Sequence, residues 1–129
     1  MNIGVVGSRT FDDYPLLDKT LDDIVEEIQS TCRVEKEEPI TIISGGASGA
    51  DAWAEIYAVK HKYELRIFEA EWNKYGKRAG PLRNKQIVEA SDVIVAFWDG
   101  KSAGTKNTIE EAGKRGSGVD LIVIRYKED

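Results

Sequence analysis

The segment 40–58 constrains the fold more than any other part of the chain. An apolar run at 40–43 leads into Ser44-Gly45-Gly46-Ala47-Ser48-Gly49-Ala50-Asp51, and apolar residues then recur at helical spacing to Ala58. This is the pattern of a strand that feeds a glycine loop, which in turn opens a helix. Backbone N–H groups of such a loop and the helix N-terminus both favour an anion such as phosphate. The pattern predicts a nucleotide-related ligand, and a tight turn without a ligand is the alternative.

Apolar runs and helical patterns alternate along the whole chain. Strands are expected at 3–6, 40–43, 65–68, 93–97 and 121–124. Helices are expected with apolar faces over 17–28 and 50–58, from near Pro81 and after Thr105, and Asp12, Asp13 and Pro15 mark the start of the first helix. The acidic stretch 35–39 should end the first helix. Strands that alternate with helices predict an α/β fold with a doubly wound, mainly parallel sheet. We expect one Rossmann-like domain over 1–129, with five strands in the order 3-2-1-4-5.

Polar, glycine-bearing segments follow three of the expected strands. Gly7-Ser8-Arg9-Thr10 follows the first, 44–51 the second and 99–105 the fourth. In a doubly wound sheet, ligands bind at the carboxyl ends of the strands, near the point where the strand order reverses. The three segments should therefore meet at one edge and form one ligand site.

Charge sets an expectation about the partner. The net charge is −5, but Lys74, Lys77, Arg78, Arg83 and Lys85 fall in a stretch without acids. Binding to DNA or RNA depends on a basic face that neutralises many phosphates. A local basic patch on an acidic chain therefore argues for a small anionic partner and against nucleic acid. A solvated basic loop is the alternative.

Several kinds of site have no support in the sequence. Cys32 is the one cysteine and His61 the one histidine, so no internal disulfide and no Cys/His metal cluster can form. We expect neither a metal nor a cofactor, and we place His61 on the surface at a helix C-terminus. The Rossmann, P-loop and nucleophile-elbow glycine patterns are absent. Without an apolar stretch of about 18 residues or room for a signal peptide, the chain is expected to be cytoplasmic and not in a membrane.

The motifs together resemble one family over nearly the whole chain. They are Gly7 to Phe11, Ser44 to Asp51, Trp72 with Tyr75-Gly76, Ala79 to Asn84, and Phe97 to Thr105. The chain resembles the YspA, cpYpsA-related branch of the SLOG superfamily, whose wider members include the LOG phosphoribohydrolases and the Smf/DprA proteins. The resemblance implies a Rossmann-like domain that binds nucleotides or molecules derived from them, and it implies no particular reaction.

The chain departs from the LOG enzymes at one position. Their late motif resembles Pro-Gly-Gly-x-Gly-Thr-x-x-Glu, and aligning Gly104-Thr105 with it puts Thr108 in place of the catalytic glutamate. Losing that carboxylate removes a general acid or base that contributes typically ~10²-fold or more. Asp51 and Asp99 remain as candidate catalytic carboxylates. Asp51 could instead cap its helix or bind a ribose hydroxyl.

The expected ligand contacts have distinct roles. Loop amides and hydroxyls would hold phosphate, Arg9 and Arg83 would add charge-assisted contacts, and Trp98 would stack on a base. Trp72 and Tyr75 could form a lid, with packing as the alternative for the tryptophans. The full predicted set is Gly7, Ser8, Arg9, Ser44, Gly45, Gly46, Ala47, Gly49, Asp51, Arg83, Asn84, Trp98, Asp99, Ser102, Gly104, Thr105 and Thr108.

Three classes of function fit these observations. The favoured one is a module that senses, carries or sequesters a nucleotide-derived small molecule. The others are a LOG-like N-glycosidic-bond hydrolase and a nucleic-acid-associated protein of the Smf/DprA type. The acidic charge weighs against the last and Thr108 against the hydrolase. The sequence leaves open the base, the number of phosphates and whether the chain forms a homodimer.

Overall fold

The computed structural model describes residues 1–31 and 39–126 and shows strands alternating with helices. Each predicted strand and each predicted main helix is present, within a few residues of the expected bounds. The first helix begins at Tyr14, beside the predicted start signals at 12–15, and continues past the apolar face at 17–28 to Thr31. The stretch 35–39 expected to end it lies mostly outside the described residues. The elements are β1 Asn2–Gly7, α1 Tyr14–Thr31, β2 Thr41–Ser44, α2 Ala50–His61, β3 Glu64–Ile67, α3 Trp72–Tyr75, the 3₁₀ turn Gly76–Arg78, α4 Ala79–Ala90, β4 Val93–Trp98, α5 Ala103–Arg115, the 3₁₀ turn Gly116–Gly118 and β5 Asp120–Arg125.

The five strands form one sheet in the order β3-β2-β1-β4-β5, which confirms the predicted topology. All four pairings are parallel, and β1 lies between β2 and β4 in the middle of the sheet. The strand order reverses between β1 and β4. β2 and β3 follow β1 on one side of it, and β4 and β5 are then added on the other side. This reversal places the loops after β1 and β4 next to each other at the carboxyl edge.

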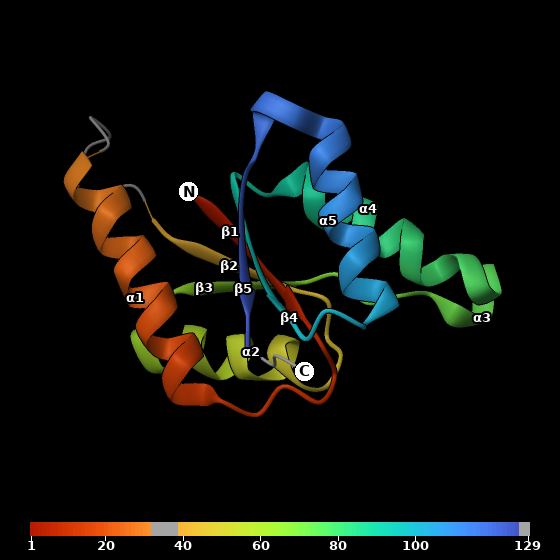
Figure 1. The fold of residues 1–129 in the computed structure, drawn as a ribbon, viewed down its shortest axis with the longest axis horizontal. Helices are drawn as coiled ribbons and strands as arrows, with labels where there is room; N and C mark the ends of the chain where they lie inside the picture. Colours follow the sequence, from red (N-terminus) through yellow and green to blue (C-terminus); the bar gives the residue numbers. More distant parts are fainter. Residues whose placement is uncertain (32–38, 127–129) are drawn as a thin grey trace.

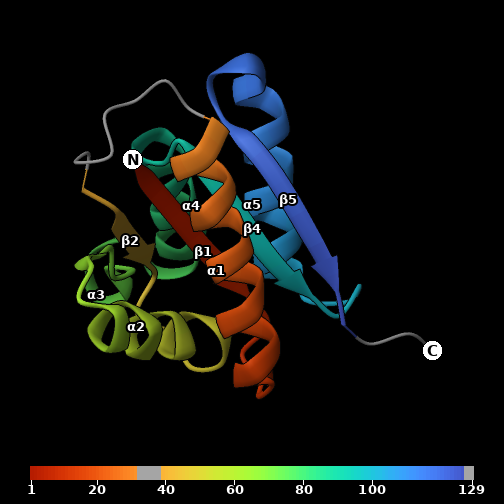
Figure 2. The ribbon, with the colours of Figure 1, turned by 90° about the vertical axis from the view of Figure 1, so that its left-hand side faces the viewer.

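Helices cover both faces of the sheet. α1 and α2 lie on one face and α4 and α5 on the other (Figures 1 and 2). Side chains along a strand alternate between the faces, so Val5 and Val95 join the core under α1 and α2, whereas Val6 and Ile94 join the core under α4 and α5. The two cores explain why the central strands read as continuous apolar runs.

The predicted basic loop has more regular structure than its charge suggested. α3 and a 3₁₀ turn occupy 72–78, and α4 begins at Ala79, two residues before Pro81. α3 contacts α4, so this segment lies against the beginning of α4, although the residues at 72–78 are exposed. Proline is accommodated in the first turn of a helix because the N–H groups there have no partner within the helix.

Ser8 ties the loops of the carboxyl edge together. Its N–H donates to Phe97 O at 3.1 Å, its carbonyl accepts the N–H of Ala50 at 3.3 Å, and its hydroxyl lies 3.4 Å from the N–H of Asp99. Gly49 makes this close approach possible: its φ is 75°, and a side chain there would collide with Ser8 O. The loops after β1, β2 and β4 are therefore fixed to one another by backbone geometry.

The lengths and hydropathy of the helices were compared with those of membrane-spanning helices. In the part of the chain that the structure describes, no helix combines the length and the apolar character that crossing a bilayer requires.

Candidate functional site

A cavity of about 330 Å³ opens at the carboxyl edge of the sheet, where the loops after β1, β2 and β4 meet the start of α4. We name it the inner cavity. It lies at the reversal point of the strand order, as the sequence predicted for a ligand site. Its lining combines backbone, hydroxyl, amide, guanidinium and carboxylate groups, contributed by Val6, Gly7, Ser8, Arg9, Thr10, Ala47, Asp51, Arg83, Asn84, Ile87, Asp99, Ser102, Gly104, Thr105 and Thr108.

A second cavity of about 320 Å³, the middle cavity, adjoins the first. The two share Arg9, Ala47 and Arg83 in their linings, and the middle cavity adds the glycine loop after β2 and part of the segment that leads into α3. Its lining residues are Arg9, Gly45, Gly46, Ala47, Ser48, Glu69, Ala70, Trp72 and Arg83. Two arginines therefore stand at the boundary between two neighbouring cavities.

The two arginines differ in how they are held. Arg83, half-buried on α4, donates from Nη1 to Gly45 O at 2.6 Å and from Nε to Asn84 Oδ1 at 2.9 Å. Burial lowers the pKa of Arg83, as does the neighbouring Arg9, whereas Asp51 raises it. The Arg9 side chain is exposed and makes no hydrogen bond or ion pair with any described residue. Arg9 is thus free to move toward an anion, and Arg83 is fixed in place.

Asp51 is the buried acid of the site. Only 6% of its surface is exposed, and Oδ2 accepts the N–H of Ala47 at 3.2 Å. Burial raises the pKa of Asp51 to about 6, and nearby Glu55 also raises it, while the Ala47 N–H and Arg83 lower it. Its carboxyl is thus mostly ionised at pH 7, where it accepts hydrogen bonds, and gains a proton to donate as the pH falls through about 6.

Most polar groups at the start of α5 bind one another. Asp99 Oδ1 accepts the N–H groups of Lys101 and Ser102, each at 2.8 Å, and so shapes the turn before the helix. Thr105 Oγ1 donates to Ser102 Oγ at 3.2 Å, and buried Thr108 donates to Gly104 O at 3.2 Å. The position of the LOG glutamate therefore carries a hydroxyl that is already paired. The N–H groups of the first helical turn remain available to an anion, because they have no intrahelical partner.

Asn84 links α4 to α5. It is 6% exposed, and Nδ2 donates to Gly104 O at 3.3 Å and to Asn107 Oδ1 at 3.0 Å. Its oxygen accepts the Arg83 Nε–H. Asn84 lines the inner cavity, but in this arrangement its amide supports the walls of the cavity.

Some predicted ligand contacts lie outside the inner cavity. Gly45 and Gly46 line the middle cavity, whereas Ser44, Gly49 and Trp98 line neither. The fully buried Ser44 accepts the N–H of Gly46, and its hydroxyl lies 3.1 Å from both Asp51 O and Glu55 Oε2. Ser44 and Gly49 thus shape the loop from beneath.

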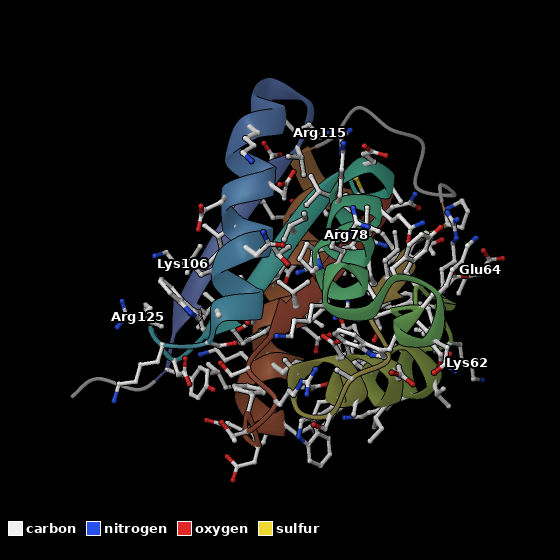
Figure 3. The ribbon with its side chains drawn as sticks, turned by 90° about the vertical axis from the view of Figure 1, so that its right-hand side faces the viewer. Lys62, Glu64, Arg78, Lys106, Arg115 and Arg125 are labelled. Atoms are coloured by element: carbon white, nitrogen blue, oxygen red, sulfur yellow. The ribbon has the colours of Figure 1, made fainter. Side chains whose placement is uncertain are left out.

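Trp98 faces another part of the molecule. Its Nε1–H donates to Ser102 O at 3.1 Å, and the Arg125 guanidinium lies 5.2 Å from its ring. Figure 3 shows Arg125 beside the start of α5, away from Arg78 at α4. In this structure one ring face already has a cationic partner from β5, and the stacking of Trp98 on a base stays a prediction.

The sequence reasoning missed several lining residues. Val6 and Ile87 line the inner cavity, and their apolar character gave no signal beyond core packing. Thr10, next to Arg9, did offer a signal, since it belongs to the same polar loop. Ser48, Glu69 and Ala70 line the middle cavity, where Trp72, predicted only as a lid, also lies.

The doubly wound parallel sheet with a polar cavity at its carboxyl edge defines a Rossmann-like α/β protein. A family model described as the YspA, cpYpsA-related SLOG family matches residues 1–75. The chain belongs to this family, which confirms the resemblance drawn from the motifs.

Similar proteins include one phage sequence and two bacterial structures. The Gene 61 protein of Mycobacterium phage D29 is 39% identical over 83 residues, which are 60% of this chain and 66% of that protein. DNA processing protein A from Streptococcus pneumoniae superposes with a TM-score of 0.69 at 18% identity, over 98% of this chain and 50% of the other. The Helicobacter pylori protein of the same name gives 0.67 at 18% identity, over all of this chain and 67% of the other. The chain therefore spans between half and two thirds of the length of these proteins.

These comparisons overturn the expectation about the partner. We expected a small nucleotide-like molecule, with nucleic acid argued against, but the H. pylori protein has a single-stranded DNA binding mode. A net charge of −5 is a sum over the whole chain, whereas binding depends on the charges that face the ligand. The prediction against a nucleic-acid partner is therefore wrong, because it was drawn from the net charge of the whole chain.

Proposed function

We propose that the chain binds single-stranded nucleic acid along the inner and middle cavities, with a backbone phosphate between Arg9 and Arg83. The observation that carries this proposal is the pair of guanidinium groups at the boundary of two adjoining cavities. A ligand that continues from one cavity into the next would pass between them. The proposal extends to this chain the single-stranded DNA binding of the H. pylori protein, which has the same fold.

The electrostatics of the site support an anion. Arg9 lies close enough to Arg83 to disfavour the charge of Arg83, so a phosphate between the two guanidinium groups would relieve repulsion. The first turn of α5 adds N–H groups that point toward the carboxyl edge. Charge-assisted contacts of this kind are among the stronger hydrogen bonds in proteins.

The nearby acids limit where the phosphate can lie. Asp51 and Asp99 line the inner cavity, but Asp99 is turned toward the backbone at 101–102 and Asp51 toward Ala47. A phosphate at the boundary would be nearer the arginines, and the sugar or base would occupy the inner cavity. A buried carboxyl suits a sugar hydroxyl or a base N–H better than it suits phosphate.

Fluorescence anisotropy with a labelled oligothymidylate of about 12 nucleotides tests the proposal. Arg9→Ala should weaken binding about tenfold and reduce the salt dependence by roughly one phosphate contact, because Arg9 supports no other described part of the fold. Lys19→Ala is the matched control, since it removes one positive charge from an exposed position on α1, away from both cavities.

Two outcomes would contradict the proposal. The first is no binding of DNA or RNA oligonucleotides at low salt. The second is a free mononucleotide that competes as well as the oligonucleotide, since this would show that the site holds a small molecule.

A further inference from the structure

A third hollow continues the two cavities beyond the sheet edge. This outer cavity, of about 840 Å³, shares Glu69, Ala70 and Trp72 with the middle cavity. The middle cavity in turn shares the two arginines with the inner one. The three hollows thus follow one another from the start of α5, past the glycine loop, to the segment around α3.

Trp72 stands where the middle and outer cavities meet. Its side chain is 51% exposed, although tryptophan is among the side chains that gain most from burial. It lines both cavities, so the exposed part of the indole faces the path between them. From this geometry we infer that Trp72 is a base-stacking platform, which makes the site a groove for a strand of several nucleotides; the inference rests on the proposed function.

The indole is held in position from below by α4. A Cβ at Gly80 would lie 3.2 Å from Trp72 Cη2, so the six-membered ring lies over the backbone of the first turn of α4. Gly80 itself is buried. The absence of a side chain at Gly80 lets the ring approach the helix closely, and the rest of the indole remains exposed. An aromatic ring fixed at one edge and open elsewhere can stack on a base with little loss of conformational entropy.

The charges around Trp72 favour a base over a phosphate at this point. Glu69 lines both cavities and Glu71 lines the outer one, while Lys74 is the cation of the outer lining. Carboxylates repel phosphate but accept the N–H groups of bases. The stacked base would therefore lie near the glutamates, and the backbone would run toward the arginines on one side and toward Lys74 on the other.

The test compares Trp72 with an exposed apolar residue outside the cavities. Trp72→Ala should weaken oligothymidylate binding by about 5- to 150-fold, the range for loss of one stacked base, and Trp72→Phe should restore part of it. Leu82→Ala is the control: Leu82 is 42% exposed on α4 and lines none of the three cavities. Circular dichroism melts of each variant establish that the fold is retained.

Two further readouts separate stacking from a merely structural role. Intrinsic tryptophan fluorescence of the parent should be quenched by the oligonucleotide, and the quenching should largely disappear in Trp72→Phe. An abasic oligomer with the same phosphates should bind the parent and Trp72→Ala equally.

The inference and the proposed function can fail separately. If Arg9→Ala weakens binding but Trp72→Ala binds like the parent, the groove beyond the arginines is refuted and the proposed function stands. If affinity does not rise between a mononucleotide and an oligomer, or no oligonucleotide binds, both are refuted. Quenching that persists unchanged in Trp72→Phe would also refute stacking on Trp72.

Discussion

Replacing Asp51 by asparagine should change how the stability of the protein depends on pH. Burial raises the pKa of Asp51 from 3.8 to about 6 in the folded state. Between these values the folded protein binds more protons than the unfolded chain, so the free energy of unfolding falls as the pH rises. A difference of about two units, at 1.36 kcal/mol per unit, amounts to about 3 kcal/mol lost between roughly pH 4 and pH 6.

The side chain introduced by Asp51→Asn cannot ionise, yet its oxygen can still accept the N–H of Ala47. The stability of Asp51→Asn relative to the parent should therefore increase by up to about 3 kcal/mol as the pH is raised through this window. Urea denaturation followed by circular dichroism at several pH values measures the difference. Asp12→Asn makes the same charge change at an exposed position and reports the effect of net charge alone. Parallel profiles for Asp51→Asn and the parent would refute the reasoning.

Three other predictions concern Asp51 and Gly49 at the same site and Asp18, which joins α1 to α2. Oligonucleotide binding should tighten below about pH 6, because protonated Asp51 no longer repels phosphate, and Asp51→Asn should flatten this dependence; equal pH profiles in the two proteins would contradict it. Gly49→Ala should cost about 1–3 kcal/mol in chemical denaturation, because φ is 75° and the new methyl group meets Ser8 O, so an unchanged midpoint would argue against this loop geometry. Asp18 accepts a hydrogen bond from His61 at 3.0 Å, which is the main cause of its lowered pKa, so its stabilising effect is present above about pH 4 and lost in more acidic solution. Asp18→Asn should cost about 1 kcal/mol at pH 7, and the cost should become smaller as the pH is lowered below about 4 in the same denaturation assay.

Arg83 shows why a charge in a sequence does not define a role. From sequence, Arg83 was assigned only a charge-assisted contact with the ligand. In the structure Arg83 holds the glycine loop through Gly45 O and contacts Asn84, which reaches α5. Arg83→Ala would therefore disturb the walls of the cavity as well as the ligand, which is why Arg9 gives the cleaner test.

Sequence patterns were sufficient to predict the fold and the sheet edge at which the polar loops meet. The apolar runs around Val5 and Val95 need a sheet covered on both faces, and the helical spacing from Leu17 to Ile28 supplies one of the covering layers. The glycine segments after β1, β2 and β4 then meet at the carboxyl edge as a consequence of parallel topology. Periodicity and chain connectivity suffice for this, because they do not depend on the detailed packing of side chains.

Which polar groups face a ligand depends instead on tertiary contacts. Trp98 lies in a promising motif but outside the three cavities, whereas Thr108 lines the inner cavity with its hydroxyl already donated to Gly104 O. Trp72 lines the middle and outer cavities with its ring against α4, where Gly80 leaves room for it. Asp51 acquires its raised pKa from burial beneath the loop that it helps to form. Such properties arise from contacts between distant segments, so a pattern of neighbouring residues does not contain them.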